Sequence, residues 1–174
     1  MVDLRAECGD ITHYATDAIV NAANRDLAPG GGVCGAIHRA AGPELARAAE
    51  PLGAIDTGAA RLTPGFDLPA AFVIHAVGPV WQGGTADEDR LLARAYAASL
   101  GLAADRGLAT IAFPAISCGV FGYPVTRGTA VAVGAVRAWL AGPGATASVQ
   151  RVVFVCADKA VRAGFDAALA ATDR

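Results

Sequence analysis

Short apolar runs alternate along the chain with longer segments in which apolar residues recur at helical spacing. The short runs predict strands at residues 2–8, 18–20, 59–63, 72–77, 110–113 and 152–156. The longer segments predict helices at residues 35–49, 89–106, 126–140 and 160–171, the first interrupted at Gly42-Pro43. Strands that alternate with helices predict an α/β fold with a mostly parallel sheet that is covered on both faces.

Composition narrows the class of protein. The chain has 174 residues, 54% of them hydrophobic, which argues against disorder, and no repeat or long linker divides it, so we expect a single domain over residues 1–174. The net charge of −2 provides no electrostatic footprint for nucleic acid. No signal peptide or membrane-spanning run is evident, and the four cysteines form no CxxC pair. We therefore expect reduced thiols in a cytoplasmic protein, with no membrane partner.

Two glycine-rich loops carry the strongest chemical signal. Residues 30–38 and residues 117–122 each follow a strand-like run and open a helix-like one. Glycine lets backbone N–H groups approach a ligand closely, and a helix N-terminus favours anions. One such loop suggests a phosphate site but also fits a plain flexible connection, whereas two together favour a clasp around a pyrophosphate.

The first loop also matches the dinucleotide fingerprint of oxidoreductases, Gly30-x-Gly32-x-x-Gly35. That fingerprint belongs in a tight turn directly after the first strand, whereas about nine residues separate Val20 from Gly30 here. A nicotinamide enzyme also needs an acidic residue for a ribose. Asp56 has roughly the right distance from the loop but lies in a turn rich in glycine.

Polar residues next to the predicted strand ends are candidates for ligand contacts. Asp10 is either a turn cap or an acceptor for an exocyclic amine such as that of adenine. Asn24 is suited to bond ribose hydroxyls, because ligands of open α/β sheets lie at this edge, and Asn21 is better suited to tie down the loop backbone. Both amides also fit simple turn roles. Phe121 favours a sugar or a base as its neighbour.

The histidines favour structural roles. His38 lies one turn into a predicted helix and His75 lies inside a predicted strand, where a single histidine is usually a hydrogen-bonded core residue. With His13 included, the spacing shows no metal-ligand pattern. We expect neither a metal nor a cofactor.

These stretches, in this order, resemble a macrodomain. The matching segments are residues 9–12, 17–24, 30–42, 73–79 and 113–124. The long match of the first loop, which continues through residues 36–42, points to the branch that includes O-acetyl-ADP-ribose deacetylases and mono-ADP-ribosyl hydrolases. The resemblance implies a three-layer α/β/α sandwich with a mixed, mostly parallel central sheet and an ADP-ribose cleft.

The resemblance also implies roles for individual residues. Asp10 would bind the adenine amine, Ile11 would lie beside the ring, and Asn24 would hold the distal ribose, against which Phe121 would pack. The pyrophosphate would be wrapped mainly by backbone N–H groups of Gly31, Gly32, Val33, Cys34 and Gly35 and of Ser117, Cys118, Gly119, Val120 and Phe121. The implied ligand is ADP-ribose or an ADP-ribosylated protein, and we expect a monomer.

Three positions depart from the family pattern. Most members of this branch have an aspartate at Cys34, which orients or activates the attacking water. Many have tyrosine at Phe121, and many have an aromatic residue at Ala157 that stacks on adenine. The loss of that stack would cost roughly 1–3 kcal/mol unless another apolar group covers the ring.

Cys34 leaves several alternatives open. One alternative is a reactive thiol that acts as nucleophile or base. A second is a disulfide with Cys118, and a third is a small apolar side chain that only fills space. The catalytic candidates are therefore Asn24, Cys34 and Phe121. Our leading hypothesis is a hydrolase of ADP-ribosyl esters with an altered, substrate-assisted site, and the alternative is a non-catalytic module that reads ADP-ribose.

Overall fold

A computed structural model describes residues 1–171 of the chain and contains one mixed sheet of six strands in the order β1-β6-β5-β2-β4-β3. Five neighbouring strands pair in parallel, and only the edge strand β3 runs antiparallel to its neighbour. The strands span β1 Asp3–Cys8, β2 Ala18–Ala22, β3 Ala60–Pro64, β4 Phe72–Ala76, β5 Thr110–Phe113 and β6 Arg151–Cys156.

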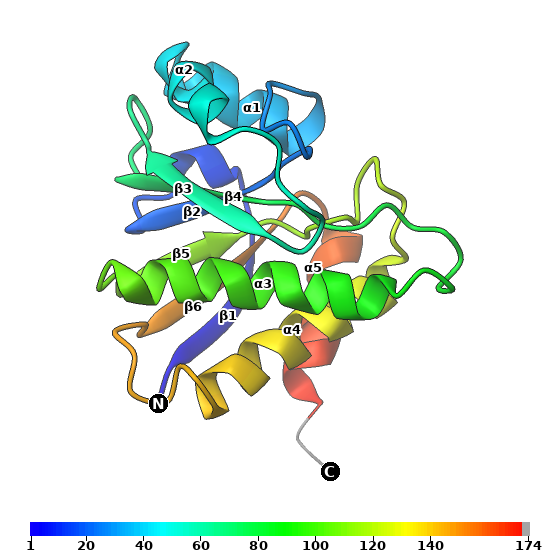
Figure 1. The fold of residues 1–174 in the computed structure, drawn as a ribbon. Helices are drawn as coiled ribbons and strands as arrows, with labels where there is room; N and C mark the ends of the chain where they lie inside the picture. Colours follow the sequence, from blue (N-terminus) through cyan, green and yellow to red (C-terminus); the bar gives the residue numbers. More distant parts are fainter. Residues whose placement is uncertain (172–174) are drawn as a thin grey trace.

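Helices cover both faces of the sheet. They span α1 Gly32–Ala41, α2 Glu44–Ala49, α3 Glu88–Asp105, α4 Val125–Ala141 and α5 Lys159–Ala170. Figure 1 shows α3, α4 and α5 side by side across one face, with α1 and α2 together on the other side. The predicted α/β class and the mostly parallel sheet, covered on both faces, are confirmed.

Local sequence signals explain where the first helices begin and end. Gly42 adopts φ 85° after α1 and donates its N–H to the carbonyl of His38, and Pro43 follows, so the helix ends at the predicted break. The start was predicted less well, because α1 begins at Gly32 rather than at Gly35. Two short 3₁₀ helices, Ile11–His13 and Glu50–Leu52, were not predicted.

A large apolar core lies between the sheet and helices α3–α5, and a smaller one lies under α1 and α2. Phe154 stacks on Phe165 with ring centroids 4.4 Å apart, which fixes α5 against β6. This packing holds the parallel strands in register, so the carboxyl ends of β1, β6, β5 and β2 meet at one edge of the sheet. The loops that carry most of the candidate ligand contacts leave the sheet at that edge.

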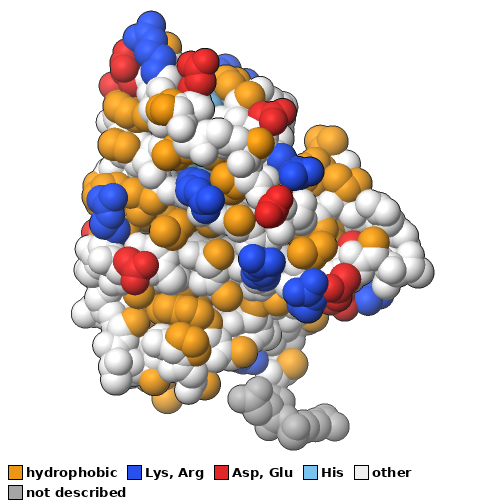
Figure 2. All heavy atoms as spheres, in the orientation of Figure 1, with side chains coloured by type: hydrophobic (Ala, Val, Ile, Leu, Met, Phe, Trp, Pro, Cys, Tyr) orange, Lys and Arg blue, Asp and Glu red, His pale blue; other side chains and the backbone are white. Residues whose placement is uncertain are grey.

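The surface offers few other signals. Figure 2 shows basic and acidic side chains interspersed over the face that carries α3, without a continuous basic patch. Within residues 1–171, none of the helices combines the length and the apolar character that a membrane crossing requires.

Candidate functional site

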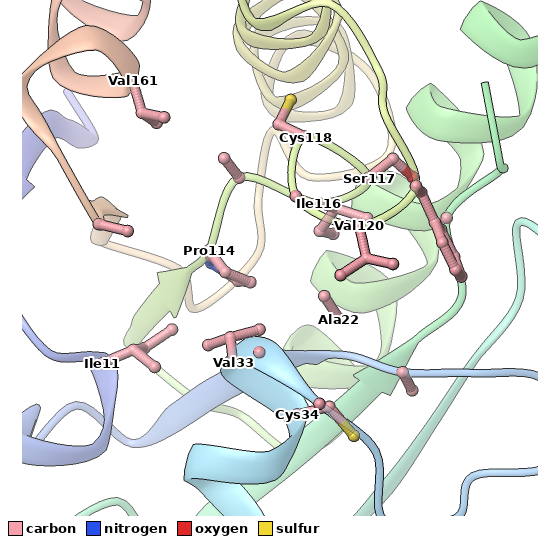
Figure 3. Close-up of a pocket in the computed structure, with 18 of the residues that line it drawn as sticks. Ile11, Ala22, Val33, Cys34, Pro114, Ile116, Ser117, Cys118, Val120 and Val161 are labelled. Carbon is pink, nitrogen blue, oxygen red and sulfur yellow. The ribbon is translucent and has the colours of Figure 1, made fainter.

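A cavity of about 560 Å³ opens at the carboxyl edge of the sheet between the two glycine-rich loops. Figure 3 shows Val33 and Cys34 on one side, and Ser117, Cys118 and Val120 on the other. The expected ligand residues that line this cavity are Ile11, Asn24, Gly31, Gly32, Val33, Cys34, Ser117, Cys118, Gly119, Val120 and Phe121. Asp10 and Gly35 do not line it. Segments far apart in sequence therefore meet here as expected.

The first loop presents the N-terminus of α1 to the cavity. Gly31 precedes the helix in an extended conformation and provides no side-chain cap, and Gly32 adopts φ 56°. The first-turn N–H groups are therefore left for a ligand. Gly35 has a different task, because a Cβ there would lie 2.5 Å from the carbonyl oxygen of Gly30. Its N–H donates to the Gly31 carbonyl at 3.1 Å, and its expected contact with the ligand stays a prediction.

The second loop is held in an unusual conformation. Ser117 has φ 67° although it is not a glycine, and Gly122 has φ 71°. Within the described chain, the backbone N–H groups of Ser117, Gly119, Val120 and Phe121 donate no hydrogen bond. The Phe121 carbonyl accepts the backbone N–H of Trp81 at 2.8 Å, which anchors the loop from outside. The loop thus offers a row of donors to an anion.

The end of the cavity near β1 and β6 is apolar. Figure 3 shows Ile11 and Val161 on this side, and Ala157 and Val155 also line it. Asp10 lies just outside. Its Oδ1 accepts the backbone N–H of Thr12 at 2.9 Å and the Thr12 hydroxyl at 2.7 Å, and these bonds lower the pKa of its carboxyl. Asp10 therefore caps the turn through Oδ1, while its Oδ2 lies 3.7 Å from Nε2 of the exposed His13.

Asn24, rather than Asn21, ties down the loop backbone. Its Nδ2 donates to the carbonyl of Ala28 at 2.9 Å and its Oδ1 accepts the Ala28 N–H at 3.1 Å. One hydrogen and one lone pair of this amide remain for a sugar. Asn21 does not hold the loop backbone. It is buried and contacts His75, its register partner on β4.

Cys34 is buried and its thiol is engaged on both sides. Its Sγ lies 3.7 Å from the Ala28 carbonyl oxygen, to which it donates, and 3.7 Å from Nδ2 of Asn21, from which it accepts. This geometry supports a small, tethered side chain rather than a free nucleophile.

A disulfide between the two loops is not present. All four cysteines are free, and Figure 3 shows the sulfurs of Cys34 and Cys118 on opposite sides of the cavity, pointing away from each other. Burial raises the pKa of the Cys118 thiol to about 11, so it stays protonated at neutral pH. The structure therefore gives no support to a redox pair between these residues.

His75 has the hydrogen-bonded surroundings that were expected, whereas Nε2 of the buried His38 has no hydrogen-bond partner among the described residues. His75 is fully buried, and burial lowers its pKa to about 4, with a smaller contribution from His38. Burial also lowers the pKa of His38. Among the described residues, no cluster of histidine, cysteine or acidic side chains could hold a metal ion.

The acidic residue that a nicotinamide enzyme would need does not lie at the cavity. Asp56 is exposed, pairs with Arg25 at 3.3 Å and does not line the cavity.

Comparison with known proteins decides the family. A family model described as "Macro domain" matches residues 20–132. A "Macro domain-containing protein" of Lactiplantibacillus plantarum is 49% identical over 171 residues, with 98% of each chain covered. The chain belongs to the macro domain family.

Solved macrodomains share the fold. An Oceanobacillus iheyensis macrodomain with ADP superposes with a TM-score of 0.88 and 38% identity, covering 94% of this chain and 88% of that one. A Trypanosoma brucei macrodomain in complex with ADP-ribose gives a TM-score of 0.88 and 37% identity, covering 95% and 68%. The three-layer macrodomain architecture is thereby confirmed.

Sequence reasoning missed several residues of this macrodomain cavity. Gly78, Pro114 and Val161 line the cavity. Thr63 does not line it but contacts the buried ring of His75. Gly78 has a readable signal, because it follows a predicted strand directly. Val161 and Thr63 have none, since only the folded sheet and α5 bring them to the site.

Proposed function

We propose that the macrodomain cavity binds ADP-ribose and hydrolyses its esters. The reaction is removal of ADP-ribose from glutamate or aspartate side chains of mono-ADP-ribosylated proteins, or deacetylation of O-acetyl-ADP-ribose, or both. One observation carries the proposal: unused backbone N–H groups from two loops face a single cavity. Such an arrangement suits a pyrophosphate, and Asn24 beside it suits a ribose.

The nucleobase end supports the same ligand. Ile11, Val155 and Val161 provide an apolar surface next to Ala157, and the Asp10 carboxylate lies at the margin. These side chains cover a base without an aromatic stack. An adenine that offers its amine to Asp10 fits both features.

Hydrolysis does not require an acid at position 34. In a glutamyl or aspartyl ester the leaving group is a carboxylate with a pKa of about 4, which departs with the bonding electrons and needs little protonation. The remaining demands are an oriented water and a fixed sugar. Water forms a bond to the anomeric carbon of the ribose as the carboxylate departs, and the proton that the water loses passes to solvent. A pyrophosphate oxygen of the ligand orients that water, while Asn24 and the loop N–H groups hold the ribose.

A non-catalytic reader of ADP-ribose is the second candidate. The observation that favours it is the tethered thiol of Cys34, because a missing general base costs about 10²–10⁴ in rate. Such a module keeps the whole binding cavity and lacks turnover.

Binding and hydrolysis measured side by side separate the two functions. Calorimetry with ADP-ribose tests binding, and release of ADP-ribose from a glutamate-linked mono-ADP-ribosylated protein tests hydrolysis. Turnover by the wild type and by Cys34→Ala supports the substrate-assisted enzyme. If ADP-ribose binds but is not released from the modified protein above the uncatalysed rate, at saturating protein, the non-catalytic module is supported. Absence of binding overturns both.

Cys34→Asp then reports on the rest of the site. We expect it to be faster than the wild type, because Asn21 already directs an N–H donor at side chain 34. If Cys34→Ala binds ADP-ribose but loses all turnover, the thiol itself is required and the substrate-assisted mechanism is wrong.

A further inference from the structure

Three buried polar side chains on neighbouring strands contact one another in a row that ends at Cys34. Asn21, His75 and Thr63 belong to the neighbouring strands β2, β4 and β3, and all three are buried. Nδ2 of Asn21 lies 3.2 Å from Nδ1 of His75, and Nε2 of His75 lies 2.9 Å from the hydroxyl of Thr63. With the contact between Asn21 and Cys34, a continuous chain links the cavity to the edge strand.

The last member of the chain sets the direction of its hydrogens. The Thr63 hydroxyl donates to the carbonyl oxygen of Pro64 at 3.1 Å, so it accepts from His75. His75 therefore carries its hydrogen on Nε2 and accepts on Nδ1. Its lowered pKa keeps the ring neutral, so Nδ1 keeps its free lone pair. Asn21 must turn its NH₂ group, rather than its oxygen, toward this nitrogen.

The amide orientation determines what residue 34 encounters. The NH₂ group of Asn21 has a second hydrogen, and that hydrogen faces the sulfur of Cys34. The oxygen of Asn21 has no partner among the described residues, so this orientation leaves one buried acceptor unpaired. Position 34 is consequently held as a site for a hydrogen-bond acceptor.

We propose that Thr63 and His75 are positioning residues that act through Asn21 and keep side chain 34 an acceptor at the edge of the cavity. The effect of these residues on catalysis rests on the proposed function, in which residue 34 borders the reacting ribose. The chain does not touch the ligand. Its effect is to fix the tautomer of one ring, the orientation of one amide and thereby the place of side chain 34.

The wild type alone provides the first test. Nitrogen-15 spectra of the histidine rings distinguish a hydrogen on Nε2 from one on Nδ1. We expect His75 to carry it on Nε2 and to remain neutral from pH 8 down to about 5. A hydrogen on Nδ1 in the wild type overturns the proposal.

Variants of Thr63 provide the second test. Thr63→Val removes the acceptor, so we expect the hydrogen of His75 to move to Nδ1 and the Asn21 amide to turn its oxygen toward residue 34. Thr63→Ser keeps the hydroxyl and the wild-type tautomer. If Thr63→Val folds with an unchanged tautomer, the chain is not directional. If Thr63→Val fails to fold, the wild-type spectrum still decides.

A carboxyl introduced by Cys34→Asp reports the orientation of Asn21 without any turnover. In that background the Asn21 N–H stabilises the ionised form, which lowers the pKa of the carboxyl. Adding Thr63→Val brings the amide oxygen close and raises that pKa by about one unit. Adding Thr63→Ser leaves it unchanged. Carbon-13 titration of the carboxyl measures this, and equal values in all three proteins overturn the proposal.

Ester hydrolysis completes the comparison. We expect Cys34→Asp with Thr63→Val to have a kcat about tenfold below that of Cys34→Asp, with an unchanged KM, and Thr63→Ser to restore it. A rise in KM together with a fall in kcat indicates general loosening of the fold and contradicts a positioning role. If none of these proteins hydrolyses the ester, the proposed function fails, and the ring tautomer and the titration still decide the proposal about the chain.

Discussion

Asn24 and Ala28 face each other across two hydrogen bonds, and the same Ala28 carbonyl oxygen also accepts the thiol of Cys34. One backbone carbonyl thus ties together the two side chains that border the expected distal ribose. This shared oxygen anchors the loop between β2 and α1.

Replacing Asn24 tests this tether together with the sugar contact. Asn24→Ala removes both hydrogen bonds to Ala28 and the groups left for a ribose. With about 1 kcal/mol for each bond, we expect ADP-ribose to bind about 10–100-fold more weakly in calorimetry. Arg25→Ala is the control, because Arg25 contacts Asp56 and Ile55 outside the cavity and its loss should leave affinity unchanged. Equal affinities for the two variants would contradict this role of Asn24.

Ala157 offers a gain of affinity. It is exposed and lines the apolar end of the cavity. We expect Ala157→Phe to place a ring on the nucleobase and strengthen ADP-ribose binding by about 1–3 kcal/mol. Ribose 5-phosphate, which lacks the base, should bind both proteins equally. Ala160→Phe adds the same ring outside the cavity, and a matching gain there would show that the effect is not stacking.

Acid should destabilise the fold through His75. Its pKa is 6.5 in an ordinary environment and about 4 in the folded protein. Between these values the unfolded chain binds a proton that the folded chain does not, so stability is complete above pH 6.5 and falls as the pH drops toward 4. The loss from this group is about 3 kcal/mol.

Urea unfolding at several pH values from 7 to 4.5 measures this slope. His75→Gln should flatten most of it. His38→Gln should flatten less, because its pKa is lowered by burial alone and its ring is less enclosed. An unchanged slope in His75→Gln would refute the assignment.

Gly35 should be intolerant of any side chain. Its Cβ would lie 2.5 Å from the Gly30 carbonyl oxygen, so Gly35→Ala must displace the first loop. We expect a loss of about 1–3 kcal/mol in the free energy of unfolding. Gly101→Ala in α3 meets open space and should stabilise the helix by up to about 1 kcal/mol. Equal destabilisation by Gly35→Ala and Gly101→Ala would show that the contact with the Gly30 carbonyl oxygen is not the cause.

Much of the architecture is legible from the sequence because it depends on local patterns. All six strands and the main helices follow from apolar periodicity, and Gly42 with Pro43 marks the break between α1 and α2. The two 3₁₀ helices were not predicted, because each has only three residues and is too short to show an apolar periodicity.

The site was predictable only in part. The two loops could be found because they are contiguous in sequence. The contact of Asn21 with His75 could not be predicted, because His75 belongs to another strand. Gly35 was assigned to the ligand because a motif does not reveal which glycine faces a ligand and which faces a carbonyl.

Strand order has a consequence for how the protein is made. β6 lies between β1 and β5, so the first strand of the chain cannot join the sheet until the last one has left the ribosome. The nucleobase end of the cavity, with Val155 and Val161, is therefore the final part to be built. A nascent or truncated chain that ends before residue 151 carries both glycine loops and lacks this wall.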